Sequence, residues 1–399
     1  MHKIAILGFG VVGGGVADLI TNNKKEVESL GGDAISISYI LDLRDFPDSP
    51  FADRVVHDFN VIINDETVDT VIEVMGGSHP AYEYTVAALS AGKNVITSNK
   101  EVVANFGDEF LALAKEKGVV YRFEAAVGGG IPVLSPLISH VKQNKIREVR
   151  GILNGTTNYI LTKMFTFGES FENALADAQA RGYAERIPDA DVLGTDACRK
   201  ISILSGLVDG ALPNVADVPT EGITGIRSED VARLLPLGYT VKLLGRSIHE
   251  ADGKRVMVSP FVIGLDSILS SVAGVFNAVE VIGDPLGSVV FYGPGAGGGA
   301  TASAVVGDLM LTMREGTSYA APVFQKGGAI KSPDSFSACF YVSVKDVSED
   351  DLDALFGGRD VVSNEGEHAF FTSRMTLGEL KDKLGRLGGT LLSYIPVLA

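Results

Sequence analysis

Four charged side chains stand close together in the segment GYAERIPDADVLGTDACRK, residues 182–200. Glu185 and Asp191 lie in its loop. Asp196 and Lys200 follow on an expected helix, four residues apart and therefore on one helical face. In a cleft, a carboxylate beside an amine can hold an amino-acid substrate and move a proton from its hydroxyl group. On an exposed helix the same spacing would be a solvated ion pair of little consequence.

The N-terminal segment predicts a dinucleotide site. An apolar run at residues 4–7 leads into Gly8, Gly10 and Gly13 and then into a helical pattern, which is the context that G-x-G-x-x-G requires. Gly8 permits a tight turn, Gly10 lets backbone amides approach a pyrophosphate, and Gly13 lets the helix lie close to the strand. The alternative is a Gly-rich turn of some other α/β protein. We do not expect a signal peptide, because the glycines interrupt the apolar run.

The second expected strand, residues 35–41, ends in LDLRDF, a sequence that bears on the choice of cofactor. Asp42 could accept a hydrogen bond from the adenosine ribose, and Arg44 could meet the 2′-phosphate of NADP. The sequence therefore leaves both NAD and NADP open.

Two later segments predict further strands of an open parallel sheet. Residues 68–77 and 92–101 each read as a short buried strand followed by a loop. Loops at the carboxyl ends of such strands carry the ligand. Lys100 lies on the second of these loops, where it is either a ligand-binding group or a plain surface charge.

The composition sets the class of protein. With 399 residues, 46% hydrophobic and 21% charged, the chain is long enough for two or three globular domains. No apolar run approaches the length of a membrane span. The net charge of −16 argues against nucleic acid or anionic membranes as partners. Two cysteines, Cys198 and Cys339, fit neither a disulfide framework nor a zinc site, so we expect a reducing cytoplasm.

Two other segments are rich in turn-forming residues. RFEAAVGGGIPVL, residues 122–134, places Glu124 before a Gly-rich turn whose carbonyl groups could converge with it on a hard cation. A hinge between domains is the alternative. ILNGTTNYIL, residues 152–161, sets short polar side chains between apolar runs, which is typical of a turn or of a helix N-cap.

Taken in order, these segments resemble homoserine dehydrogenases over roughly residues 1–320. The resemblance rests on GFGVVG, TSNK, EAAVGGGIP, NGTTNYIL, the segment 182–200 and YGPGAGGGATASAVVGDL at 292–309. It implies interconversion of L-homoserine and L-aspartate 4-semialdehyde in threonine, methionine and isoleucine biosynthesis, with NADP or NAD. It also implies a structural monovalent cation (Na or K), no catalytic metal, and a homo-oligomer, either dimer or tetramer. No aspartokinase-like segment precedes the glycine motif, so we expect a monofunctional member.

Carried over residue by residue, the resemblance gives each site its expected residues. The catalytic candidates are Lys200 and Lys100. The residues expected around the substrate are Glu185, Asp191, Asp196, Gly182 and Thr156. The residues expected at the cofactor are Gly8, Phe9, Gly10, Val11, Val12, Gly13, Arg44, Gly76, Ser98, Lys100 and Gly297. The cation is expected at Glu124 and the backbone carbonyls of Val127, Gly129 and Ile131.

A lysine suits the proton transfer that this reaction needs. As hydride reaches the aldehyde carbon, the developing alkoxide must gain a proton, and a nearby ammonium group can stabilise the charge and donate. In the reverse direction the neutral amine accepts the hydroxyl proton. Glu185 and Asp191 suit the substrate ammonium. Asp196 suits the orientation of Lys200, and which of the two lysines moves the proton stays open.

The C-terminal segment predicts a separate unit that begins near Ser335. Its expected order is a strand at 336–344, a helix at 349–358, a hairpin around Gly366, a helix at 376–387 and a strand at 390–398. This βαββαβ order is ferredoxin-like, and it resembles the ACT domains of many homoserine dehydrogenases, which bind amino-acid effectors. The first loop, KDVSEDD, lacks the Pro-Gly turn that ACT domains often use, so a dimerisation module without a ligand is the alternative.

We therefore predict an α/β protein in three parts. A Rossmann dinucleotide-binding domain takes residues 1–127 and 300–320, an α+β substrate and dimerisation domain takes 128–299, and an ACT-like domain takes 335–399. Arg186 and Ile187 depart from the family pattern before the proline of the loop, which predicts altered substrate affinity. A non-catalytic sensor and a dehydrogenase of another short amino-acid aldehyde are the alternative functions; a sensor has no need of both lysines.

Overall fold

The computed structural model describes residues 1–363 and 366–398 of the chain. The chain divides into two compact units, each built from three stretches of sequence. The first unit comprises Met1–Lys145, Ser202–Ala216 and Phe291–Gly328. The second unit comprises Ile146–Ile201, Asp217–Val290 and Ala329–Ala399.

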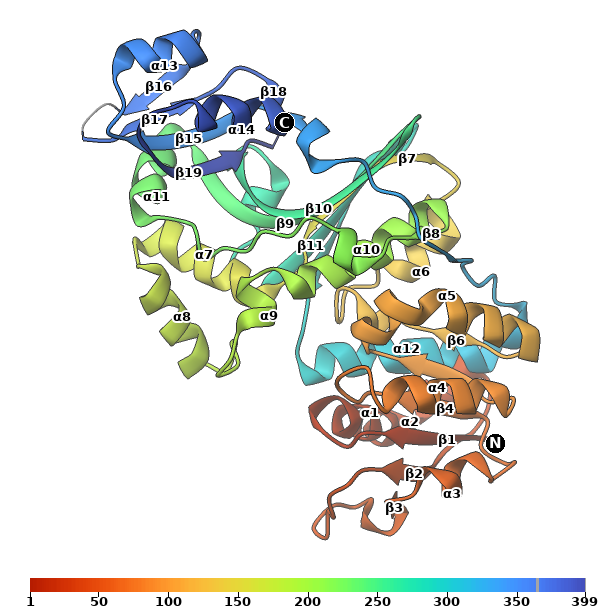
Figure 1. The fold of residues 1–399 in the computed structure, drawn as a ribbon. Coiled ribbons are helices and arrows are strands. Elements are labelled where there is room, and N and C mark those ends of the chain that lie inside the picture. Colours follow the sequence, from red (N-terminus) through yellow and green to blue (C-terminus); the bar gives the residue numbers. More distant parts are fainter. Residues whose placement is uncertain (364–365, 399) are drawn as a thin grey trace. The chain divides into compact units, whose positions relative to one another are not determined.

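A parallel sheet forms the centre of the first unit, with the strand order β3-β2-β1-β4-β5-β6 (Figure 1). This is the order of the doubly wound dinucleotide-binding fold, so the expected α/β class is confirmed for this part of the chain. The strands are β1 (His2–Leu7), β2 (Ile35–Leu41), β3 (Val55–Val56), β4 (Thr70–Glu73), β5 (Asn94–Thr97) and β6 (Tyr121–Arg122). β4 is buried along its whole length, as expected of a strand with both faces covered.

Five helices of the first unit connect these strands, and α6 and α12 follow the last strand. They are α1 (Val11–Asn22), α2 (Lys24–Gly31), α3 (Phe59–Ile63), α4 (Ala81–Ser90), α5 (Lys100–Lys117), α6 (Leu134–Pro136) and α12 (Gly298–Glu315). α12 returns from far along the chain to pack on α1 and α2. Its buried side chains Val305, Val306 and Leu309 join Val16 and Ile20 of α1 in one hydrophobic core. A short parallel pair, β8 (Ala211–Leu212) with β13 (Gln325–Lys326), also belongs to this unit.

The larger sheet of the second unit has the order β10-β9-β7-β11-β12. Its strands are β7 (Lys145–Ile152), β9 (Tyr239–Glu250), β10 (Gly253–Gly264), β11 (Phe276–Asp284) and β12 (Gly287–Pro294). The helices of this part are α7 (Gly155–Phe167), α8 (Phe171–Ala180), α9 (Asp189–Val192), α10 (Thr195–Asp209) and α11 (Ser228–Leu234). α10 and β12 each contribute residues to both units.

The chain from residue 340 onward contains an antiparallel sheet of order β16-β17-β15-β19 within the second unit. The chain order is β15 (Phe340–Lys345), α13 (Glu349–Phe356), β16 (Asp360–Ser363), β17 (His368–Phe371), α14 (Leu377–Gly385) and β19 (Thr390–Pro396), which is the ferredoxin-like arrangement. Leu352 and Phe356 of α13 and Leu380 of α14 lie in one core with the strands. α14 begins with a capping box in which Thr376 and Glu379 bond to each other's backbone amides.

One detail of this part of the chain differs from the sequence prediction. The strand expected at 336–344 is interrupted at Cys339. β14 (Ser337–Ala338) pairs with β18 (Met375–Thr376), and only β15 enters the four-stranded C-terminal sheet. The hairpin expected around Gly366 is present as β16 and β17, and its residues 364–365 lie outside the described part of the chain.

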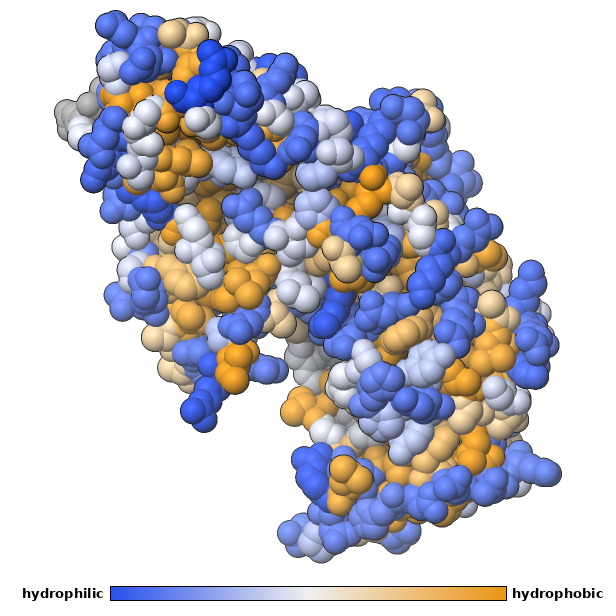
Figure 2. Space-filling model, viewed as in Figure 1, coloured by the Kyte–Doolittle hydropathy of each residue, from blue (hydrophilic) through white to orange (hydrophobic). Residues whose placement is uncertain are grey.

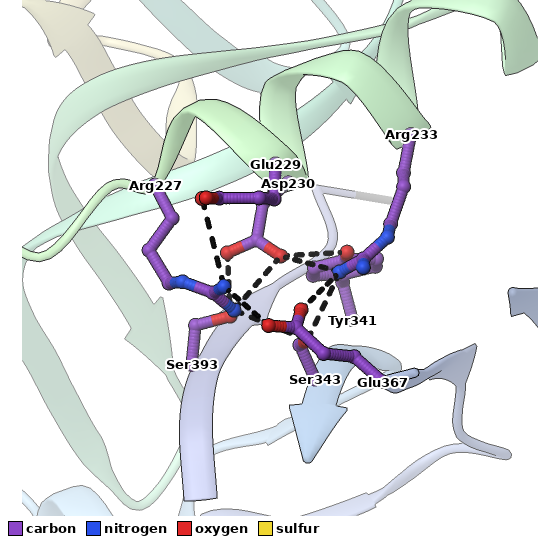
Figure 3. Close-up of polar contacts among 8 residues, drawn as sticks. All are labelled: Arg227, Glu229, Asp230, Arg233, Tyr341, Ser343, Glu367 and Ser393. Atoms are coloured by element: carbon purple, nitrogen blue, oxygen red, sulfur yellow. Dashed lines mark hydrogen bonds and ion pairs between the residues drawn. The ribbon is translucent and has the colours of Figure 1, made fainter. Parts of the chain in front are cut away.

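A cluster of polar side chains fastens α11 to this C-terminal sheet (Figure 3). The α11 charge cluster consists of Arg227, Glu229, Asp230, Arg233, Tyr341, Ser343, Glu367 and Ser393. Asp230 is buried and accepts hydrogen bonds from the hydroxyls of Tyr341 at 2.8 Å and Ser393 at 2.7 Å. Glu367 pairs with both arginines, at 2.8 Å to Arg227 and 2.9 Å to Arg233.

The face of the molecule drawn in Figure 2 carries many hydrophilic residues with smaller apolar patches among them. Among the described residues, no helix combines the length and the apolar character that crossing a membrane requires.

Candidate active site

The glycine motif of the first unit forms a tight strand-to-helix turn. Gly8 has a φ of 95°, a backbone conformation that favours glycine. A Cβ atom added at Gly13 would lie 2.0 Å from the carbonyl oxygen of Gly8, so α1 can approach β1 only with glycine at that position. Gly10 is the N-cap of α1, and a Cβ atom there would meet nothing within 4 Å. The turn therefore presents open backbone at a helix N-terminus, which suits a pyrophosphate.

Asp42, directly after β2, faces this turn. Its Oδ2 accepts a hydrogen bond from the backbone amide of Phe9 at 2.8 Å. The guanidinium of Arg44 bonds to both Asp42 oxygens at 3.0 Å, and Arg44 Nη2 also donates to the carbonyl of Phe9 at 3.4 Å. Arg44 is thus tied to the carboxylate, and it holds the pKa of Asp42 well below its usual range.

Glu73, a buried acid, is the last residue of β4 and bonds to Thr97, the last residue of β5. Its Oε2 accepts the Thr97 hydroxyl at 2.6 Å, and its Oε1 accepts the Met75 amide at 2.8 Å. Asn99 caps α5 by accepting from the amides of Glu101 and Val102, so Lys100 is the first residue of that helix. Burial raises the pKa of Glu73 to about 7.

The remaining cofactor candidates of the first unit lie on the same loops or on α12. Gly76 belongs to the loop after β4, and Ser98 donates its backbone amide to the carbonyl of Glu73 at 3.3 Å. Gly297 is the N-cap of α12, with a φ of 111°. A Cβ atom at Gly298 would lie 2.5 Å from Val11 Cγ1, so the N-termini of α12 and α1 are in contact.

In the second unit, the acidic segment and the NGTT turn come together. Asn154 is the N-cap of α7: its side-chain oxygen accepts from the Thr157 amide at 2.8 Å. Its amide nitrogen donates to Asp191 at 2.6 Å and to Asp196 at 3.0 Å. One asparagine therefore joins two carboxylates that lie 37 and 42 residues further along the chain.

Lys200 completes this cluster. Its Nζ lies 2.7 Å from Asp196 Oδ2 and 2.7 Å from the carbonyl oxygen of Leu153. Lys200 and Asp196 are both buried, so the pair is not the solvated surface pair that the spacing alone allows. Burial raises the pKa of Asp191, and the charge of Asp196 adds to this shift, whereas the Asn154 hydrogen bond opposes it. The side chains of Asn154, Asp191, Asp196 and Lys200 are named the substrate cluster, after the role that the sequence predicts for its charged members.

The other predicted substrate residues lie at the edge of the substrate cluster or outside it. The Thr156 hydroxyl donates to the carbonyl of Tyr183 at 2.6 Å, which ties α7 to the loop between α8 and α9. Gly182, with a φ of 75°, begins that loop. Glu185 lies on its exposed part, where its backbone carbonyl accepts from the side chain of Gln179. Lys100 belongs to the first unit, whereas Lys200 belongs to the second.

Glu124, the predicted cation ligand, is buried in the first unit. Its two oxygens accept the backbone amides of Val133 at 2.7 Å, Leu134 at 2.8 Å and Ser135 at 2.6 Å. Its own amide donates to Asp308 of α12, a fully buried carboxyl whose pKa is raised to about 7 by burial and by the charge of Glu124. The following turn contains Gly129, where a Cβ atom would lie 2.5 Å from the carbonyl oxygen of Gly295.

Comparison with known proteins shows to which family the chain belongs. A family model described as "Homoserine dehydrogenase, NAD binding domain" matches residues 8–124, and one described as "Homoserine dehydrogenase" matches residues 132–310. The homoserine dehydrogenase of Pseudomonas aeruginosa is 41% identical to the chain over 318 residues, which are 79% of this chain and 73% of that protein. The chain belongs to the homoserine dehydrogenase family.

Solved structures of this family extend the likeness. The crystal structure of a homoserine dehydrogenase from Thiobacillus denitrificans has a TM-score of 0.92 and 30% sequence identity, over 100% of this chain and 98% of that one. A hyperthermophilic archaeal homoserine dehydrogenase mutant in complex with NADPH has a TM-score of 0.66 and 27% identity, over 78% of this chain and 97% of that one. The likeness to the first structure therefore includes the C-terminal sheet, and the first unit is an NAD(P)-binding domain.

Sequence reasoning missed two parts of these sites. It read Asn154 only as a turn or cap, because nothing in the spacing links it to Asp191 and Asp196. It passed over Glu73, although a single charged residue at the end of the otherwise uncharged strand TVIE was a signal available in the sequence. Such a residue is expensive to bury and therefore points to a role.

Proposed function

We propose that the protein interconverts L-homoserine and L-aspartate 4-semialdehyde, using NAD or NADP. The observation that carries the proposal is the substrate cluster: a buried lysine held by one carboxylate, next to a second carboxylate, on a chain with a dinucleotide turn. The nicotinamide supplies or accepts the hydride when it is bound. The chain's own residues then have to hold the amino acid and move one proton.

Lys200 is the proposed proton carrier. Asp196 and the Leu153 carbonyl accept two of its three Nζ hydrogens among the described residues, which leaves one hydrogen for the substrate oxygen. During reduction this N–H donates to the developing alkoxide, and the neighbouring Asp196 stabilises the charged amine before the transfer. During oxidation the neutral amine accepts the hydroxyl proton. Lys100, at the start of α5, is proposed as the second cation at the reacting group.

The carboxylates are proposed to hold the substrate ammonium. Asp191 already accepts a hydrogen bond from Asn154, and its partial burial strengthens an ion pair with a bound amine. Glu185, on the exposed loop, is proposed to complete the ammonium site. Thr156 and Gly182 keep that loop next to the start of α7.

The monovalent cation, Na or K, is proposed at Glu124 with the carbonyls of Val127, Gly129 and Ile131. Two buried carboxyl groups, Glu124 and Asp308, lie together here, and a cation would offset their repulsion. Its role would be structural, fixing the turn between β6 and α6. We further propose that the protein is a cytoplasmic homo-oligomer and that its C-terminal sheet is an ACT-like module.

The test is steady-state turnover of L-homoserine with NAD or NADP, with L-serine and L-threonine as comparison substrates. Lys200→Met should lower kcat by about 100-fold or more while leaving dinucleotide binding unchanged, because general acid catalysis is worth about that much. The matched control is Lys163→Met, a lysine of α7 that pairs with Glu169 and Asp177 away from the substrate cluster. A fully active Lys200→Met variant, or turnover of another aldehyde in place of the semialdehyde, would reject the assignment.

A further inference from the structure

A fully buried carboxylate lies under the loops of the dinucleotide site. Glu73 is the last residue of β4, its relative exposure is 0%, and it is in register with Leu7 of β1 and Thr97 of β5. Strands β1, β4 and β5 are neighbours in the sheet. The loops at the carboxyl ends of such strands are those that hold a dinucleotide.

The carboxylate of Glu73 accepts hydrogen bonds that fix two of these loops. Its Oε1 accepts the Met75 amide at 2.8 Å, which fixes the loop after β4. Its Oε2 accepts the Thr97 hydroxyl at 2.6 Å, and the oxygen of that hydroxyl accepts the Asn99 amide at 2.9 Å, which fixes the turn after β5. Asn99 then bonds back to the carbonyl of Gly77 at 2.8 Å.

The same arrangement reaches the glycine turn and the start of α5. A Cβ atom at Gly8 would lie 3.1 Å from Met75 Cγ and 3.2 Å from the carbonyl oxygen of Val74, so the loop after β4 packs closely on the turn after β1. Asn99 is the N-cap that sets where α5 begins and therefore where Lys100 stands. One carboxylate thus holds the backbone around which the dinucleotide would bind.

A charged group is not needed at this place for packing. An apolar residue of similar size would avoid the cost of burying a carboxylate. The carboxylate supplies two hydrogen-bond acceptors. One oxygen accepts from the Thr97 hydroxyl and the other from the Met75 amide. A proton on Oε2 would point at Thr97 Oγ1, so the Thr97 hydroxyl could no longer donate to Glu73 in the present geometry, and loss of the negative charge would weaken the bond from the Met75 amide.

We infer that Glu73 is a positioning residue for the dinucleotide, acting through Thr97 and Asn99 on the loops after β4 and β5. The inference rests on the proposed function only in its use of NAD or NADP. It predicts weaker dinucleotide binding when the Glu73 carboxylate or the Thr97 hydroxyl is lost.

The protonation state of Glu73 should make dinucleotide binding depend on pH. Its pKa is raised to about 7, so the accepting, charged form is present above this pH and is lost as the pH falls through it. Ionisable groups on neighbouring elements include Tyr121 of β6 and Lys100 and Glu101 at the start of α5. The pKa of Tyr121 is raised well above its usual value by burial and by the charge of Glu73, so Tyr121 stays protonated over the range of the test.

The experiment is direct titration of the full-length protein with NADH and NADPH, followed by fluorescence, between about pH 6 and pH 8. For the better dinucleotide, the wild-type Kd should rise as the pH falls through about 7. Glu73→Gln and Thr97→Val should each bind about tenfold more weakly at pH 8, the loss expected for one buried hydrogen bond. Glu73→Gln should also lose the pH dependence, and Thr97→Ser, which keeps the hydroxyl, should restore wild-type binding.

Thr70→Val is the matched control. Thr70 is as buried as Thr97, but it stands at the amino end of β4 and bonds to His2. This variant should lose stability without losing dinucleotide affinity. The inference would be overturned if wild type, Glu73→Gln and Thr97→Val had equal dinucleotide affinities and equal dependence of Kd on pH. It would also be overturned if Thr70→Val lost as much dinucleotide affinity as Thr97→Val. A wild-type protein that binds neither dinucleotide would overturn it together with the proposed function.

Discussion

At the scale of one residue, Asp42 is expected to decide between the two dinucleotides. Its low pKa keeps the carboxylate charged at neutral pH. The guanidinium of Arg44 donates two hydrogen bonds of 3.0 Å to this carboxylate. This arrangement suits a ribose hydroxyl and repels a 2′-phosphate. We expect the wild-type protein to use NADH better than NADPH. Asp42→Ser should shift the ratio of kcat/KM values toward NADPH by about tenfold, equivalent to about 1.4 kcal/mol.

Asp45→Ser is the control for this measurement, because Asp45 is an exposed carboxylate on the same loop that pairs with His57. In Asp45→Ser, the ratio of the kcat/KM values for NADPH and NADH should stay at the wild-type value. If the wild-type protein preferred NADPH, or if Asp42→Ser left the ratio unchanged, Arg44 and not Asp42 would set the preference.

The sequence predicted which residues act together where those residues lie close together along the chain. Gly8 and Gly13 act within one turn, and Asp196 and Lys200 act within one helical turn, so spacing alone placed each pair. The bridge from Asn154 to Asp191 joins residues 37 positions apart and depends on how α7 and α9 pack. No periodicity encodes such a contact, so only the structure could supply it.

At the scale of an element, the N-terminus of α7 combines two tasks in one side chain. Asn154 caps the helix and donates to both carboxylates of the substrate cluster. Asn154→Ala should therefore lower the free energy of unfolding by about 1 kcal/mol, as for other lost caps. It should also raise the KM for homoserine by roughly tenfold, since the half-buried Asp191 and the buried Asp196 each lose the hydrogen bond from Asn154. Thermal unfolding and steady-state kinetics measure the two effects separately.

The N-cap of α8 provides the comparison. Ser170 accepts from the Asn173 amide at 3.3 Å, and Ser170→Ala should lower stability without changing the KM. An equal change of KM in both variants would mean that helix stability, and not the bridge, controls substrate binding.

Elements themselves were predictable where apolar runs end in clear loops. β2 has the expected bounds of 35–41, and the helix expected at 376–387 is α14 at Leu377–Gly385. The run at 336–344 reads as one strand because every residue in it suits a strand, yet β14 and β15 take different partners at Cys339. Strand partners are set by tertiary pairing, which hydrophobic pattern does not specify.

At the scale of the whole molecule, sequence order gives little guide to which parts fold together. The first unit takes up Ser202–Ala216 and Phe291–Gly328 from far along the chain. The resemblance to a family predicted the return of α12, whereas nothing in the sequence predicted the stretch that begins at Ser202. The predicted three-domain division stays a prediction. The C-terminal sheet belongs to the second unit and shares a hydrophobic core with β9 and β10 through Phe340, Leu244 and Phe261.

The α11 charge cluster predicts that this C-terminal sheet does not open independently of α11 (Figure 3). Arg233 lies between the two acids, 3.6 Å from Asp230 and 2.9 Å from Glu367. Burial raises the pKa of Asp230, whereas the hydrogen bonds from Ser393 and Tyr341 and the charges of the two arginines lower it. Arg233→Met should leave the buried Asp230 with only the more distant Arg227, at 4.0 Å, as an ion-pair partner among the described residues. We expect this loss to weaken the docking of the sheet by about 3 kcal/mol.

Amide hydrogen exchange of β15 and β19 measures this prediction, because these strands carry Tyr341, Ser343 and Ser393 into the cluster. In Arg233→Met both strands should exchange about 100-fold faster, the equivalent of roughly 3 kcal/mol, while β1 and β4 of the first unit keep their protection. Arg386→Met is the control, since Arg386 and its partner Asp382 are exposed on α14 and such a pair is worth less than about 1 kcal/mol. Unchanged exchange in Arg233→Met would mean that the hydrophobic core alone holds the sheet, and that the ionic contacts add nothing to its docking.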